Sequence, residues 1–356
     1  MSRFLNAFHK ALLPYVPGEQ PVDMQYIKLN TNESPFPPSQ KVQDCLSAAE
    51  IENLRLYPDP ECGALVRHFA AYCGMEPENI LFGNGSDENL NYCFYAFCGE
   101  NKRAAFADIT YGFYKVFTDL YHIDPLIIPL EEDFSLDTTK YYHCGATVFI
   151  ANPNAPTGIS LPAAAIEKIV QNNPDDVVIV DEAYVDFGAE SVVPLVKKYD
   201  NLLVVQTYSK SRSLAGGRLG MCIGCKELID DLKTLKYALN PYNINRLTMA
   251  AGIACLQDDS YYKSNCRTIA ENRAFLTEAL QARGFRVLPS SANFVFAEHP
   301  QYTGERLYLD LKAKGILIRH FETARIRNFN RITVGTREQL QALLQTIDSL
   351  FEEEHL

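Results

Sequence analysis

Short apolar runs rich in Val and Ile alternate with longer amphipathic stretches from about residue 80 to residue 236. Runs of this kind indicate strands, and strands that alternate with helices predict a mostly parallel sheet. Several runs lack polar alternation, as strands buried on both faces do. The sequence therefore predicts an α/β domain with a seven-stranded, mostly parallel sheet flanked by helices. The expected strands are 79–82, 103–107, 126–129, 146–151, 177–180, 202–206 and 219–224, and helices should begin at Asp87, Tyr111, Pro162, Ser191 and Lys226.

The pattern changes after Asn245, where two long helical stretches, 246–257 and 260–284, precede short strands and two further helices. This order predicts a second, smaller α+β domain. The N-terminal segment contains PYVPGEQP and ESPFPPS, which cannot form the interior of a helix, so we expect it to wrap over other elements. The predicted division is 45–244 for the large domain, with an N-terminal arm (1–44) and a small domain (245–356).

Composition excludes several classes of protein. The content of 47% hydrophobic and 22% charged residues is that of a globular protein, and a net charge of −11 argues against a nucleic-acid or membrane-surface partner. No apolar run is long enough to span a membrane, and residues 1–10 lack the apolar core of a signal peptide. Ten cysteines are too few for a disulfide scaffold, so we expect a reducing cytoplasm. No second pair of metal ligands accompanies Cys222 and Cys225, so we expect both to be free thiols that hold no metal.

The most informative segment is VVIVDEAY, which puts Asp181 just past the carboxyl end of an expected strand. Ligands bind at that edge of an open α/β sheet, and a desolvated carboxylate there needs a cationic partner. A magnesium ion would require a GxxxxGK[ST] loop, which the sequence lacks, whereas a protonated nitrogen of a heterocyclic cofactor remains open. The acid could also cap the following turn.

The next expected strand ends in QTYSK and delivers Thr207, Ser209 and Lys210, with Arg218 eight residues beyond the lysine. A lysine that is partly desolvated beside another cation becomes nucleophilic and suits a Schiff base. The two hydroxyls and the guanidinium could bind a phosphate. Taken alone, the segment could also be a solvated basic loop.

Two further loops follow strand ends. In GNGSDENL, Ser86 and Asp87 open a helix whose free N–H groups could hold a phosphate, or the loop could be a simple capped turn. A dinucleotide fingerprint is incomplete there. Tyr111 could stack on a planar cofactor or fill the core. Together the four strand ends supply a lysine, a carboxylate, an aromatic ring and a phosphate cup, which are the parts that pyridoxal phosphate requires. Tyr184 could then donate to the cofactor's phenolic oxygen.

On these residues the sequence resembles the fold type I aminotransferases, and within them the histidinol-phosphate aminotransferase family. The matches extend over nearly the whole chain. They are PYVPG, LNTNESP, LYPD, GNGSDE, TYGFY, NPNAPTG, IVDEAY, TYSKSRSLAGGRLG, SANFVF, GILIRHF and RITVGTREQ.

The resemblance implies a fold type I enzyme that exchanges an amino group between histidinol phosphate and 2-oxoglutarate, as a homodimer. It also implies the role of each site residue. By this resemblance Lys210 forms the Schiff base, Asp181 pairs with the ring nitrogen, Tyr184 contacts the phenolic oxygen and Tyr111 stacks on the ring. The cofactor phosphate is held by Ser86, Asp87, Thr207, Ser209 and Arg218, and Tyr57 reaches it from the neighbouring subunit. Arg331 and Arg319 bind substrate anions, and Tyr15 closes over the substrate phosphate.

One position departs from the family pattern. The common form is NPNNPTG, and here Ala155 replaces the asparagine that normally donates to the phenolic oxygen. Either Asn154 is re-aimed to do so, or Tyr184 carries the task alone.

Three rival functions remain open on the sequence. Threonine-phosphate decarboxylase and a broad aromatic aminotransferase use the same scaffold. A non-catalytic binding protein could also keep the fold, although intact Lys210 and Asp181 weigh against it.

Overall fold

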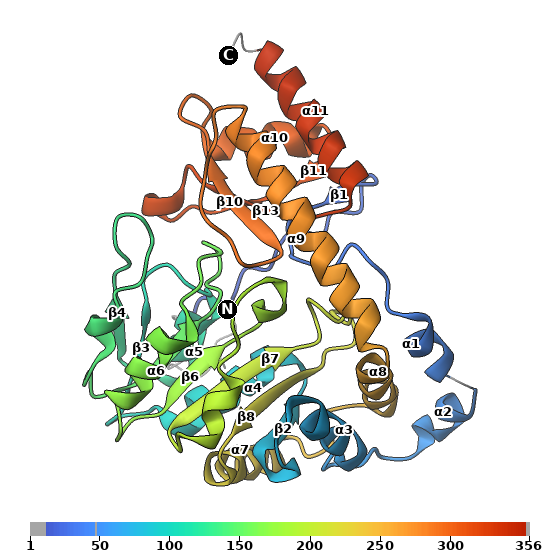
Figure 1. Ribbon diagram of the computed structural model, residues 1–356, viewed down its shortest axis with the longest axis vertical. Coiled ribbons are helices and arrows are strands. Elements are labelled where there is room, and N and C mark those ends of the chain that lie inside the picture. Colours follow the sequence, from blue (N-terminus) through green and yellow to red (C-terminus); the bar gives the residue numbers. More distant parts are fainter. Residues whose placement is uncertain (1–11, 47, 354–356) are drawn as a thin grey trace, which may run out of the picture.

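A seven-stranded sheet forms the large, lower part of the computed structural model (Figure 1), which describes residues 12–46 and 48–353. The first ten residues, for which the sequence predicts no signal peptide, lie outside the described residues. The strand order is β2-β8-β7-β6-β5-β3-β4, and β8 runs antiparallel to both neighbours while the other pairs are parallel. The strands are β2 (Ile80–Gly83), β3 (Arg103–Ala107), β4 (Pro125–Ile128), β5 (Ala146–Ala151), β6 (Val178–Asp181), β7 (Leu202–Thr207) and β8 (Gly220–Gly224).

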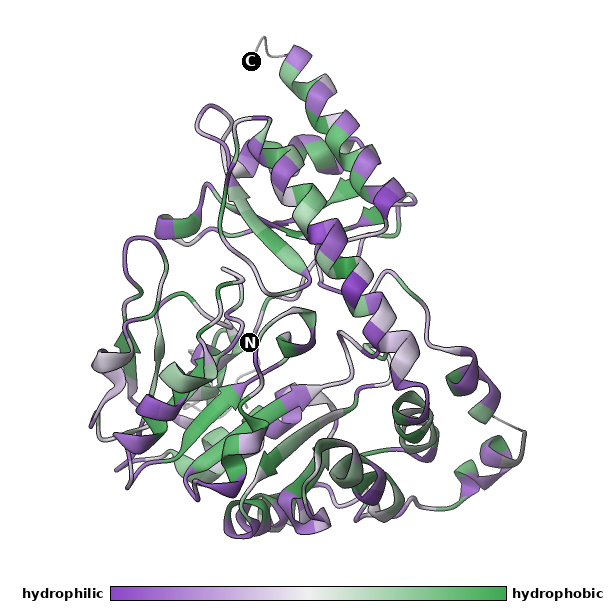
Figure 2. Ribbon diagram, in the orientation of Figure 1, coloured by the Kyte–Doolittle hydropathy of each residue, from purple (hydrophilic) through white to green (hydrophobic). Residues whose placement is uncertain are grey.

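Both faces of this sheet are apolar, because successive side chains of its central strands point to opposite faces and both sets are hydrophobic. In β6, Val178 and Val180 join one core cluster, and Ile179 joins the other. Helices cover both faces, with their apolar sides turned toward the strands (Figure 2). One face carries α3 (Gly63–Cys73), α6 (Ala163–Gln171) and α8 (Arg246–Gln257), and the other carries α4 (Gly85–Phe97), α5 (Phe113–Tyr121) and α7 (Lys226–Leu239).

The upper part of the molecule contains an antiparallel four-stranded sheet, in the order β12-β13-β10-β9, with its own core. The N-terminal segment joins it, because β1 pairs in parallel with β11. The long helix α9 rises from the large sheet to this part (Figure 1). The elements are β1 (Ile27–Lys28), α9 (Asp259–Gln281), β9 (Arg286–Val287), β10 (Phe294–Glu298), α10 (Gly304–Ala313), β11 (Ile316–Leu317), β12 (Arg319–His320), β13 (Asn330–Thr333) and α11 (Arg337–Glu353).

The predicted fold class is confirmed: the sheet has seven strands, is mostly parallel and is flanked by helices. The domain limits at 45 and 244 stay a prediction, and core packing of the large sheet continues through Ala251 and Cys255 of α8 to Tyr262 in α9. The prediction that a helix begins at Ser191 is wrong. A five-residue 3₁₀ helix, Val193–Lys197, stands there, because the Glu182 carboxylate ties down Ser191 and Val192 and the chain must enter β7 a few residues later. The helices α1 (Gln40–Cys45), α2 (Ala48–Glu52) and α3 were not predicted.

Candidate active site

A cavity of about 440 Å³ lies at the carboxyl ends of β5, β6 and β7, between the two sheets. Ala151, Asp181 and Thr207, the last residues of these three strands, line it from below, and Arg319 and Arg331 line it from the small sheet. This edge is where open α/β sheets bind their ligands. Twelve of the fourteen residues expected at the site line this one cavity: Tyr15, Ser86, Asp87, Tyr111, Asp181, Tyr184, Thr207, Ser209, Lys210, Arg218, Arg319 and Arg331.

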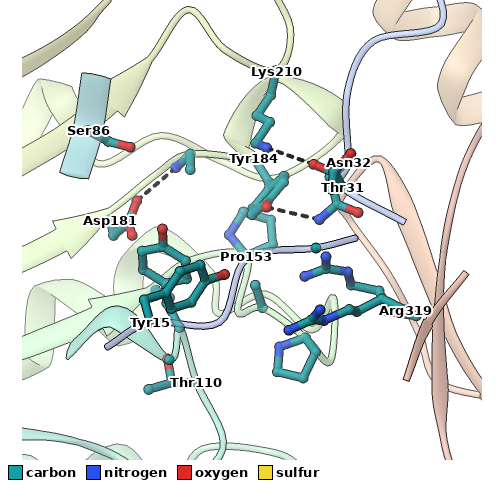
Figure 3. Close-up of a pocket in the computed structure, with 18 of the residues that line it drawn as sticks. Tyr15, Thr31, Asn32, Ser86, Thr110, Pro153, Asp181, Tyr184, Lys210 and Arg319 are labelled. Atoms are coloured by element: carbon teal, nitrogen blue, oxygen red, sulfur yellow. Dashed lines mark hydrogen bonds between the residues drawn. The ribbon is translucent and has the colours of Figure 1, made fainter. Parts of the chain in front are cut away.

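Lys210 and Asp181 both point into this cavity (Figure 3). Lys210 lies in the turn that follows β7, and its Nζ donates to the Thr31 carbonyl at 3.3 Å and lies 5.7 Å from the centre of the Tyr184 ring. A carbonyl and an aromatic face both favour an amine without holding it in an ion pair. The lysine is therefore available to a ligand that enters the cavity.

Asp181 is a buried carboxylate whose hydrogen-bond donors are neutral. The Tyr114 hydroxyl donates to its Oδ2 at 3.1 Å, and the Ala183 N–H donates to its Oδ1 at 3.2 Å. Burial raises the pKa of Asp181 to about 6, against the opposing effect of these two donors. A carboxylate in this position is stabilised further when a cation enters the cavity beside it.

An anion cup lies at the start of α4. Gly85 adopts a φ of +81°, and a Cβ there would meet Arg218 Nη2 at 2.6 Å, so the backbone and the guanidinium approach closely because this residue is glycine. Free N–H groups at the helix start and the hydroxyls of Thr207 and Ser209, which are 3.0 Å apart, line the same side of the cavity. This donor set suits a phosphate.

Asp87 fixes two neighbours of this cup. Its Oδ1 accepts from the Tyr111 hydroxyl at 2.7 Å, and its Oδ2 lies 3.3 Å from Arg218 Nη2. The aspartate therefore holds the edge of the Tyr111 ring on one side and the guanidinium on the other. Burial, with Asp87 adding to it, holds the pKa of Tyr111 well above its ordinary value, so the phenol stays neutral and keeps its proton on this bond.

Two arginines stand at the opposite side of the cavity. Arg331 is half-buried; its Nη2 donates to the Asn30 carbonyl at 3.0 Å, and its Nε is buried with no hydrogen-bond partner among the described residues. Burial lowers the pKa of Arg331 from its usual value. A half-buried cation held by neutral groups offers an anion both a charge and an unused donor.

Arg319 holds the N-terminal segment across this side of the cavity. Its guanidinium donates to the carbonyls of Val16 and Pro17 at 3.0 and 3.2 Å. The neighbouring Tyr15 packs its ring against Phe113, with centroids 4.7 Å apart. The Pro-rich segment thus runs over other elements, as its sequence predicts.

Asn154 and Tyr57 do not line the cavity. The Asn154 amide donates to the Ile109 carbonyl and to the Thr157 hydroxyl, and its oxygen accepts from Thr110 at 2.8 Å. These contacts occupy the amide, and Ala155 lines the cavity in its place.

Tyr57 is 80% exposed and stacks on Tyr242 with centroids 4.6 Å apart. It lies outside the cavity and is exposed, so its expected contact with a cofactor requires a second copy of the chain.

Sequence reasoning missed two residues that act on the site. Tyr114 lies in TYGFY and supports Asp181, and Asn32 lies in LNTNESP and donates to the Tyr184 hydroxyl at 3.0 Å. Both motifs were recognised, but a role for these two positions required knowing which side chains meet in space.

The described residues contain no group of three or more His, Cys, Asp or Glu that could hold a metal ion. Cys222 is buried in β8, and the thiol of Cys225 donates to the Asp200 carbonyl. In the described part of the chain, every helix is too short or too polar to cross a bilayer.

Comparison with known proteins identifies the family. The family model described as aminotransferase class I and II matches residues 24–347. The chain is 47% identical to the histidinol-phosphate aminotransferase of Brachyspira hyodysenteriae over 348 residues, covering 98% of both chains. It is 48% identical to that of Marinomonas sp. over 353 residues, covering 98% of this chain and all of the relative.

Solved structures share the fold. The histidinol-phosphate aminotransferase of Clostridium acetobutylicum superposes with a TM-score of 0.85 at 24% identity, covering 92% of this chain and 99% of that one. That of Sinorhizobium meliloti, solved in complex with pyridoxal 5'-phosphate, gives a TM-score of 0.83 at 23% identity over 92% of each chain. The chain therefore belongs to the class I and II aminotransferases and, within them, to the histidinol-phosphate aminotransferase family.

Proposed function

We propose that this enzyme uses pyridoxal phosphate to transfer the amino group of L-histidinol phosphate to 2-oxoglutarate, giving imidazole-acetol phosphate and L-glutamate in histidine biosynthesis. The observation that carries the proposal is one cavity lined by Lys210 and Asp181 together with Arg319 and Arg331. It combines a lysine amine and a buried acid with two cations that suit an anionic substrate. The relatives that match this chain over nearly its full length are named histidinol-phosphate aminotransferase, which supports the same reaction.

The residues present fit the cofactor. Asp181 is a buried carboxylate with neutral donors, which a protonated ring nitrogen would complement. When bound, pyridoxal phosphate supplies a ring that accepts electrons from the substrate carbon as that carbon loses its proton. Asp181 would keep the ring nitrogen protonated. Lys210 Nζ would hold the cofactor and would move the proton at the substrate Cα.

The remaining cofactor contacts follow from the cup at the start of α4. Backbone N–H groups of Ser86 and Asp87 bind the phosphate with the hydroxyls of Thr207 and Ser209 and the guanidinium of Arg218. Tyr111, held by Asp87, would cover one face of the ring, and the Tyr184 hydroxyl would donate to the phenolic oxygen. Asn154 would contact that oxygen only after its amide gives up the bonds to the Ile109 carbonyl and the Thr157 hydroxyl.

The two arginines serve both half-reactions. Arg331 and Arg319 bind the carboxylates of glutamate and 2-oxoglutarate in one and the phosphate of histidinol phosphate in the other. Tyr15 closes over that phosphate. Arg319 now binds the carbonyls of Val16 and Pro17, so an incoming anion competes with these bonds for the guanidinium.

We also propose a homodimer in which Tyr57 reaches the cofactor phosphate of the neighbouring subunit. Its exposure supports this, as does the presence of exposed Ile51, Leu54 and Leu56 in the same stretch of chain. The cytoplasm is the compartment we propose, in keeping with ten free cysteines.

A steady-state assay over a panel of amines tests the substrate. We expect the highest kcat/KM for histidinol phosphate with 2-oxoglutarate as acceptor. Release of carbon dioxide from threonine phosphate would instead identify a decarboxylase. A higher kcat/KM for phenylalanine would identify an aromatic aminotransferase.

A further inference from the structure

Ala155 leaves this chain without an amide donor at a point where the cavity wall meets Tyr184. Ala155 is 5% exposed and packs with Ala292, Phe294 and the Tyr184 ring. The neighbouring Asn154 cannot substitute in this conformation, because its amide already makes three hydrogen bonds. The Tyr184 hydroxyl therefore has to act without the second donor of the family pattern, and its direction matters more.

Asn32 contacts that hydroxyl from the N-terminal segment. Its Nδ2 donates to Tyr184 Oη at 3.0 Å. This bond is the dashed line between the two side chains in Figure 3. The side chain is 1% exposed, and its backbone carbonyl accepts from the Asn293 amide at 3.1 Å. Asn32 has a φ of +55°, a left-handed conformation that asparagine tolerates better than most residues. The segment is thus fixed where the amide meets Tyr184.

Thr333 determines which end of the Asn32 amide faces Tyr184. The Thr333 Oγ1 accepts from the Asn32 N–H and donates to Asn32 Oδ1, both at 3.0 Å. Thr333 is 3% exposed, so its hydroxyl hydrogen needs an acceptor, and Oδ1 provides one. The Nδ2 group is then left to face Tyr184 as a donor. Because Tyr184 accepts from this amide, its own hydroxyl hydrogen is free to point elsewhere into the cavity.

We propose that Asn32 is a positioning residue: it occupies one acceptor position of Tyr184 Oη and so favours a hydroxyl hydrogen directed toward the cofactor's phenolic oxygen, in compensation for the donor absent at Ala155. This rests on the proposed function, because it takes Tyr184 as the contact to that oxygen. Asn32 acts through Tyr184 and carries no catalytic role of its own.

The expected consequence is spectroscopic. A hydrogen bond to the phenolic oxygen stabilises the negative charge on that oxygen. It thereby weakens the attraction of the oxygen for the proton that it shares with the Lys210 nitrogen. Loss of the bond therefore holds that proton more firmly and raises the pH at which the visible band of the bound cofactor titrates. Hydrogen bonds to charged groups contribute roughly 1.5–3 kcal/mol, which corresponds to a shift of about one to two pH units.

The test is a pH titration of the absorbance of purified holoenzyme, for wild type, Asn32→Gly, Tyr184→Phe and the double variant. Glycine tolerates the left-handed φ, so Asn32→Gly removes the amide with little backbone strain. We expect each single variant to raise the titration midpoint by about one pH unit. The double variant should match Tyr184→Phe alone, because Asn32 acts only through that hydroxyl.

A matched control is Asn173→Ala, which removes a buried asparagine amide bonded to the Tyr141 and Ile169 carbonyls, away from the cavity lining. It should lower the melting temperature and leave the midpoint unchanged. An unchanged midpoint in Asn32→Gly, or shifts that add in the double variant, would overturn the inference while Tyr184→Phe still shifts. If wild type shows no band that borohydride removes, the proposed function itself fails.

Discussion

The hydroxyl of Tyr114 donates a 3.1 Å hydrogen bond to Asp181 Oδ2, from a side chain that is fully buried beneath the cavity. The bond stabilises the ionised carboxylate against the burial that raises the pKa of Asp181 to about 6. Because the proposed cofactor contact needs the carboxylate charged, the affinity for pyridoxal phosphate depends on this phenol.

Tyr114→Phe should therefore weaken pyridoxal phosphate binding by roughly tenfold or more, as expected when a bond to a charged group is lost. The pKa of Asp181 would rise further, so the loss of affinity on acidification should begin at a higher pH than in wild type. Fluorescence titration of apoenzyme at several pH values measures both effects. Tyr141→Phe is the control, since the Tyr141 hydroxyl is buried and has no hydrogen-bond partner in the described part of the chain. Equal effects of the two variants would contradict the assignment.

Arg331→Ala should lower kcat/KM for both histidinol phosphate and glutamate. Removing one partner of a buried charge pair costs roughly 2–5 kcal/mol, or about 30-fold and more. Arg286→Ala removes an exposed arginine, paired with Glu298, and should change neither value. A loss confined to one of the two substrates would show that Arg331 does not serve both half-reactions.

Glu182 gives a pH-dependent contribution to stability. Its carboxylate accepts from the Val192 N–H, the Ser191 hydroxyl and the Gln206 amide, yet burial raises its pKa from 4.5 to about 7. The folded state therefore binds more protons than the unfolded state between these values, so the contribution falls as pH rises from about 4.5 to 7.

Glu182→Gln, which cannot ionise, removes this dependence. Over that pH window, the free energy of unfolding of wild type relative to that of the variant should fall in urea titrations. A relative free energy that stays constant or rises would mean that the carboxylate is ionised throughout.

Tyr57 provides a test of the dimer. If it completes the neighbouring site, Tyr57→Ala and Lys210→Ala subunits should each be impaired alone, and a mixture refolded together should regain activity. Mixed dimers then hold one site with both native residues. A mixture no more active than its parents would show that Tyr57 acts within its own subunit or not at all.

The sequence predicts the large sheet well because its strands are buried on both faces. The expected strands 103–107 and 146–151 coincide with β3 and β5, β7 and β8 differ by one residue at one end, and β2, β4 and β6 are shifted by one residue. The residues at the strand ends converge in one cavity for the same reason, since parallel strands deliver their carboxyl ends to one edge.

Contacts between distant segments could not be predicted in this way. Asn32 reaches Tyr184 across 152 positions, and Tyr114 meets Asp181 across 67. No local pattern encodes these pairs, because they depend on how the N-terminal segment and α5 pack on the sheet. The short 3₁₀ helix at Val193–Lys197 was missed for a similar reason: the Glu182 carboxylate, from another element, fixes the chain before it.

The most direct test of the account is to locate the covalent link between cofactor and chain. Holoenzyme reduced with borohydride, digested and analysed by mass spectrometry should carry the pyridoxyl group on Lys210, and Lys210→Ala should carry none and lose the visible band. A pyridoxyl group on another lysine, or an undiminished band in Lys210→Ala, would contradict it.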